Sequence, residues 1–105
     1  MQKSESVIRY DFAKSRCCAD RLEWIAGNMR STADAGLGSA LSGIHSAWDS
    51  ESSAVFLNKG RQLQAQFMEQ SRELQKTADV IRRIAKNTYT AEMRARDIAA
   101  KGSRG

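Results

Sequence analysis

The chain has 105 residues, a formal net charge of +5 and a mean hydropathy of −0.56, which leaves room for one domain with a modest core. Proline is absent while Ala, Gln, Arg, Lys and Glu are plentiful, and this composition favours an all-α fold over strands and turns. No segment is apolar enough to span a membrane, and we expect no cleaved signal peptide because the opening residues lack an apolar stretch.

A first periodic segment covers residues of about 4–48. Apolar or small residues recur there every three or four positions, as on one face of a helix: Ile8, Phe12, Ser15, Ala19, Leu22, Ala26, Met29 and Ala33. The spacing continues from Leu37 to Trp48, one residue out of heptad phase, and such a drift alters a supercoil locally without ending the helix. We therefore predict one continuous helix, with a break near Gly36–Gly38 as the alternative.

A second apolar strip lies on this helix away from the periodic face: Cys17, Cys18, Trp24 and Ile25. Adjacent helical side chains point about 100° apart, so a disulfide between the neighbouring cysteines is not expected, and two thiols fall short of a zinc site. We expect reduced thiols and predict that the strip is a partner interface. The alternative is a scattered surface tryptophan.

The polar run of residues 49–52 separates the two halves of the chain. Asp and Ser favour turns and helix N-caps, and Glu51 suits the first turn of a following helix. We predict a tight turn over about 49–52, with Trp48 and Phe56 packed over it to hold the tip of the hairpin.

A heptad pattern runs without interruption through the second half, and it predicts a helix over about 53–100 followed by a frayed tail at 101–105. The seam predicted for this helix contains Leu63, Phe67, Leu74, Ile81 and Ile84. Only another long helix buries such a seam. We therefore predict a single domain, residues 1–105, that forms an antiparallel, coiled-coil-like two-helix hairpin, and we expect it to pair with a second hairpin in a four-helix bundle.

Charge is unevenly distributed: residues 1–52 carry six Lys/Arg and seven Asp/Glu, whereas residues 53–105 carry eleven and five. The basic half allows an alternative from another class, a helical nucleic-acid-binding protein with phosphate contacts from Arg82, Arg83, Lys86, Arg94 and Arg96. A solvated helix face is the interpretation we favour, because acids are interleaved with these bases.

No residues are spaced for catalysis, and His45, the only histidine, has no convergent partners. We predict a protein that is not an enzyme, with no cofactor, metal ion or small-molecule substrate.

The two long segments, the central turn and an aromatic residue eight positions after Trp48 resemble the WXG family of small helical proteins of type VII secretion. Trp48, Asp49, Ser50 and Phe56 match its turn motif, with Ser50 in place of the family's glycine. Tyr89 and Glu92 form a degenerate version of its C-terminal secretion signal, because the acid follows the tyrosine by three residues instead of four.

The resemblance implies a non-enzymatic protein that is made in the cytoplasm and secreted without a cleaved signal peptide. Its partners would be the secretion machinery and a helical protein: a copy of itself, a related small protein, or the helical N-terminal region of a larger effector. We expect a targeting partner for such an effector, or a co-secreted substrate. The alternatives are a free-standing secreted homodimer and a structural coiled-coil adaptor.

Overall fold

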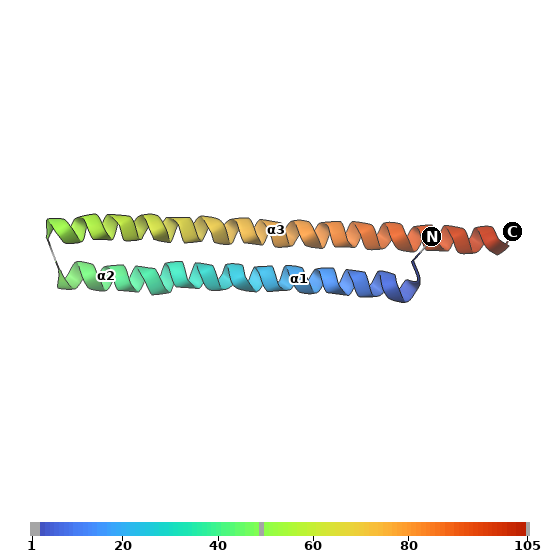
Figure 1. Ribbon diagram of the computed structural model, residues 1–105, viewed down its shortest axis with the longest axis horizontal. Helices are drawn as coiled ribbons and strands as arrows, with labels where there is room; N and C mark the ends of the chain where they lie inside the picture. The colour runs from blue at the N-terminus through green and yellow to red at the C-terminus, as the bar shows by residue number, and fades with distance from the viewer. Residues whose placement is uncertain (1–2, 49, 105) are drawn as a thin grey trace. The chain divides into compact units, whose positions relative to one another are not determined.

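The computed structural model describes residues 3–48 and 50–104, and all secondary structure in these ranges is helical (Figure 1). The elements are the α-helix α1 (Glu5–Ser31), the π-helix η1 (Thr32–Leu37), and the α-helices α2 (Gly38–Ala47) and α3 (Glu51–Arg104). The predicted all-α class is confirmed.

The chain divides into two compact units, and α1 and α3 contribute to both. Unit 1 comprises Met1–Leu22 and Lys76–Gly105, and unit 2 comprises Glu23–Gln75. In unit 1 the start of α1 packs against the C-terminal part of α3 in antiparallel fashion, because Phe12 contacts Tyr89 and Asp20 pairs with Arg82. Unit 2 is a helical hairpin in which η1 and α2 pack against the start of α3, as the contact between Gln64 and Ala33 shows.

Serine side chains cap the N-termini of α1 and α3. The Ser4 hydroxyl accepts a hydrogen bond from the Val7 amide at 3.3 Å before α1. Before α3, the Ser53 amide donates to the Ser50 hydroxyl at 3.3 Å and the Ser50 amide donates to the Ser53 hydroxyl at 2.9 Å, a reciprocal capping arrangement. No described residue has positive φ, so the backbone at Ser50 does not require the glycine of the WXG motif.

The phase drift predicted between Ala33 and Leu37 corresponds to the π-helix η1. A π-helical turn accommodates one extra residue, so the apolar positions of α2 remain on the side that faces α3, and Leu41 is buried there. The wider turn disturbs the regular backbone ladder, and the Gln64 side chain donates a 2.7 Å hydrogen bond to the Ala33 carbonyl. The chain stays helical through Gly36–Gly38, and the alternative of a break there is not observed.

The observed helix boundaries differ from the predicted ones at two places. α3 begins at Glu51, two residues earlier than predicted, because Ser50 caps it. It continues to Arg104, so the tail expected to fray from residue 101 is helical as far as Arg104. Gly102 near this end costs about 1 kcal/mol relative to alanine and does not terminate a helix by itself.

Replacing Gln64 with alanine leaves the Ala33 carbonyl without its side-chain partner, and we expect the free energy of unfolding to fall by about 1–3 kcal/mol. Gln66→Ala, at an exposed position of the same helix, is the matched control and should change it by less than about 0.5 kcal/mol. Urea unfolding followed by circular dichroism measures both, and equal effects of the two substitutions would contradict the role given to Gln64.

Candidate interaction surface

The first helix buries the centre of the face that its periodicity predicted, while Phe12, Leu22 and Met29 on the same face are half-buried and Trp48 is exposed. In unit 1, Ile8 and Ala19 are buried, and in unit 2, Ala26, Ala33 and Leu41 are buried. The face predicted for the first half of the chain is therefore confirmed.

One of the two heptad rows predicted for the seam of the second helix is wrong by one residue, and the other row lies half-buried at the edge of the contact. Phe67, Leu74 and Ile81 are only half-buried at the edge of the contact, while Leu63 and Ile84 are 45% and 56% exposed. The buried positions lie one residue further along the heptad: Leu57, Ser71, Ala78 and Ala85. This correction has a steric reason, because small residues at the centre of a contact let two helix backbones approach closely.

The two edges of the helix pair in unit 1 differ in chemistry. On one edge Arg82 forms an ion pair with Asp20 at 2.8 Å, and Arg96 approaches Glu5 at 3.6 Å. Arg9 also pairs with Glu5 and lowers the pKa of that carboxyl, with a smaller contribution from Arg96. We call this the polar edge of unit 1.

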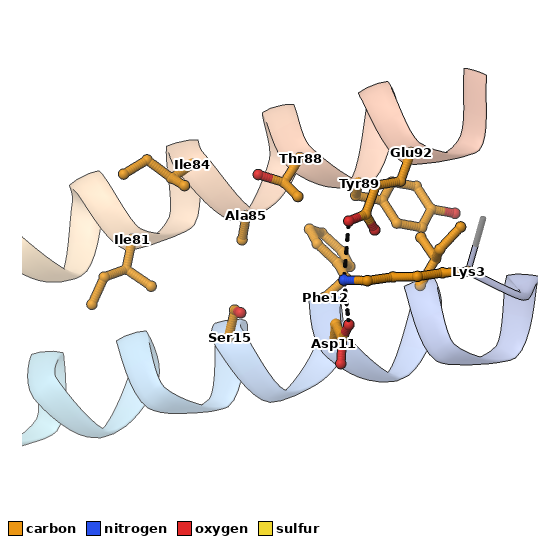
Figure 2. A pocket seen from close by; sticks show the side chains of 11 residues that line it. Lys3, Asp11, Phe12, Ser15, Ile81, Ile84, Ala85, Thr88, Tyr89 and Glu92 are labelled. Atoms are coloured by element: carbon orange, nitrogen blue, oxygen red, sulfur yellow. Dashed lines mark hydrogen bonds and ion pairs between the residues drawn. The ribbon is translucent and has the colours of Figure 1, made fainter. Parts of the chain in front are cut away.

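The opposite edge of unit 1 is apolar and contains an open pocket of about 190 Å³ between the helices (Figure 2). Figure 2 shows Phe12 and Ser15 on one helix opposite Ile81, Ile84 and Thr88 on the other. We define the apolar edge of unit 1 by this pocket and by five residues beside or along it: Val7, Ile81, Ile84, Ala91 and Ile98.

Lys3 closes one end of the pocket by bridging the two helices. Its Nζ lies 3.1 Å from Asp11 and 3.1 Å from Glu92, as Figure 2 shows. The hydrogen bond to Asp11 and then that to Glu92 raise the pKa of Lys3 above its ordinary value of 10.5. The bridge therefore contributes to stability at neutral pH, and this contribution is lost as the pH rises through the raised pKa. Sequence reasoning missed Lys3 because nothing in its neighbourhood is periodic.

Unit 2 has an apolar edge on the corresponding heptad positions, and we define it by five residues: Ile25, Phe56, Leu63, Phe67 and Leu74. Ile25, Phe56 and Leu63 are 42%, 54% and 45% exposed. Gln75 donates a hydrogen bond to Glu23 at 3.2 Å on the other edge of this unit. Unit 2 therefore also has one polar and one apolar edge.

The strip predicted as a partner interface is exposed, but its residues fall into two rows. Cys17 and Cys18 are exposed free thiols of unit 1, and Trp24 and Ile25 are exposed in unit 2. Cys18 and Ile25 are one heptad apart on the apolar side of α1, while Cys17 and Trp24 are one heptad apart on the side that faces away from α3. Cys18 and Ile25 thus share a face with the apolar edges, and Trp24 does not.

The aromatic residues of the predicted turn are more exposed than expected, and the two residues of the degenerate secretion signal contact Phe12 and Lys3. Trp48 is 51% exposed and Phe56 is 54% exposed, so they do not form the packed tip that we predicted. Trp48 has an extended backbone at the end of α2. Asp49 lies outside the described residues. Tyr89 packs on Phe12 with ring centroids 4.8 Å apart, and Glu92 holds Lys3.

Among the described residues, no group of three or more His, Cys, Asp and Glu side chains is placed to hold a metal ion. Within the same ranges, no helix is both long and apolar enough to cross a membrane. Comparison with protein-family models, with curated proteins and with solved structures finds no match to this chain.

The observed packing of unit 1 predicts different effects for Ile8 on α1 and Ile84 on α3. Ile8→Ala should lower the free energy of unfolding by about 2–5 kcal/mol because Ile8 is 2% exposed. Ile84→Ala should lower it by less than about 1 kcal/mol because more than half of that side chain is already in water. Urea unfolding at low protein concentration measures both, and a larger loss for Ile84→Ala would contradict the observed register.

Proposed function

We propose that this chain is a non-enzymatic helical partner protein. Its apolar edges pack against a second helical hairpin to form a four-helix bundle. Through that pairing it serves type VII secretion, as the small partner or targeting factor of a larger secreted effector.

The observation that carries the proposal is the heptad-spaced apolar row of α3 that the described chain leaves uncovered. In unit 1 this row contains Ile84 and Ile98, which are 56% and 64% exposed, and in unit 2 it contains Phe56 and Leu63. Isolated exposed apolar residues are ordinary on protein surfaces, but a row with heptad spacing is typical of a helix that packs against another helix. The row therefore supports a function in protein association.

The link to secretion is supported by the turn, where the chain resembles the WXG family. Trp48 is half-exposed beside a capped helix start, so its indole is accessible to another protein. Ser50 replaces the family's glycine without backbone strain, because it serves as the N-cap of α3. The departure at this position is thus compatible with the motif.

A secretion assay tests the proposal in the organism that encodes the chain. We expect the protein in the culture medium of a strain with an intact type VII system, and not in the medium of an otherwise identical strain that lacks the secretion motor. Ile84→Asp should fold, because Ile84 is exposed, yet lose export because it places a carboxylate in the row that pairs. Thr90→Asp, at an exposed residue of α3 on the side away from the apolar edge, is the matched control and should retain export.

Equal amounts of the protein in the media of the two strains would overturn the secretion part of the proposal. Export of Ile84→Asp at the level of the unmodified chain would overturn the pairing part.

A further inference from the structure

The two units carry opposite net charges. Unit 1 contains thirteen Lys/Arg and six Asp/Glu, a net of +7, whereas unit 2 contains four and six, a net of −2. The basic character of the second half of the chain is therefore concentrated in unit 1, where the end of α3 meets the start of α1.

The acidic side chains of unit 1 are already engaged with basic ones, with a single exception. Glu5 forms an ion pair with Arg9. Lys3 forms ion pairs with both Asp11 and Glu92, and Arg82 forms ion pairs with both Asp20 and Asp79. Asp97 is the exception among the described acids, and it shares a heptad position with Arg83, on the side of α3 away from the apolar edge. The acids of unit 1 therefore leave its surplus positive charge uncompensated.

Four exposed basic residues line the apolar edge of unit 1, and none of them forms an ion pair within the described part of the chain: Lys14, Arg21, Arg94 and Lys101. Lys14 and Arg21 share the heptad position of Val7 on α1. Arg94 and Lys101 lie three or four residues from Ile98 on α3, which makes them its neighbours on the helix surface. We call these four residues the basic rim.

A second copy of this chain does not supply matching acids. On α3 of unit 2, the heptad positions that correspond to Arg94 and Lys101 hold Lys59, Gln66 and Glu73, which are neutral in sum. Two copies that met through unit 1 would instead place one basic rim against another, and like charges across an interface oppose association. In both of these arrangements Arg94 and Lys101 meet no surplus of acids on α3 of the second copy.

We infer that the apolar edge of unit 1 binds an amphipathic helix of a different protein, whose apolar stripe is flanked by Asp and Glu. The inference rests on the proposed function and adds the chemistry of the partner. Apolar side chains of that helix enter the pocket between Phe12 and Ile84, and its carboxylates pair with the basic rim. Charges that flank an apolar seam select the partner of a coiled coil in this way.

Two synthetic helical peptides of about four heptads test this inference directly. Both carry Leu at the seam positions; one carries Glu at the flanking positions and the other carries Lys. At about 50 mM salt we expect the Glu peptide to bind the full chain at least about tenfold more tightly than the Lys peptide, by fluorescence anisotropy of the labelled peptide. The difference should shrink at about 500 mM salt because exposed charges are then screened.

A matched pair of double variants on α3 tests whether the basic rim causes the preference for the Glu peptide. Arg94→Glu with Lys101→Glu should abolish the preference for the Glu peptide, because both changes lie beside Ile98. Arg83→Glu with Lys86→Glu changes the net charge equally on the other sides of the helix, and it should keep the preference. Circular dichroism of each variant checks that the helices are retained.

Equal binding of the two peptides to the unmodified chain would overturn the inference. So would a stable species of about twice 11.7 kDa by light scattering that excludes both peptides, because a second copy would then occupy the edge. Tighter binding of a labelled DNA duplex than of the Glu peptide, lost on Arg94→Glu with Lys101→Glu, would assign the rim to nucleic acid instead.

Ile84→Asp separates failure of the inference from failure of the proposed function. If both peptides bind equally and Ile84→Asp weakens both, the apolar edge is a docking site and only the acidic partner is wrong. If Ile84→Asp changes the binding of neither peptide, the edge is not a docking site and the pairing part of the proposed function fails with it.

Discussion

Close contact between helices through small side chains is the constraint on which the rest of this structure depends. In unit 1 the buried positions of α1 and α3 include Ala19, Ala78 and Ala85. In unit 2 the buried positions include Ala26 on α1, Ala33 on η1 and Ser71 on α3. Alanine and serine fill little space, so the backbones approach and few large side chains fit between them. Apart from Leu57, the larger apolar residues of α3 therefore sit at the margin of the contact or outside it, and each unit is left with one apolar edge.

The two edges of unit 1 differ in chemistry, and this difference indicates a function in protein association. Ion pairs such as Arg82 with Asp20 cross the polar edge of unit 1 and neutralise its acids. On the apolar edge Lys3 spans the helices only at the end of the pocket, and the row from Ile84 to Ile98 has no covering segment in the described chain. If the apolar residues of that row served folding alone, we would expect them at the buried positions of the helix contact. Association with another helix is the use that fits such a surface.

The fold class and the buried face of the first helix are predictable from sequence, because alternating steps of three and four residues define a helix face directly. The phase drift after Ala33 is visible in the sequence as well, although its form as a π-helix held by Gln64 is not. The register of α3 was missed because hydrophobicity favours Leu63 and Ile84 as core residues, whereas Ser71 and Ala78 carry no such signal. The opposing row of alanines in the first helix is the clue that indicates a close contact.

The most direct test of this account places the same large residue at a buried and at an exposed alanine of α3. Ala78→Leu should lower the free energy of unfolding by about 1–3 kcal/mol because it forces a leucine into the closest approach of the helices. Ala91→Leu, in the exposed row with Ile84 and Ile98, should change it by less than about 0.5 kcal/mol. Denaturant unfolding of the two variants measures both free energies of unfolding. A decrease for Ala91→Leu with no decrease for Ala78→Leu would contradict the account.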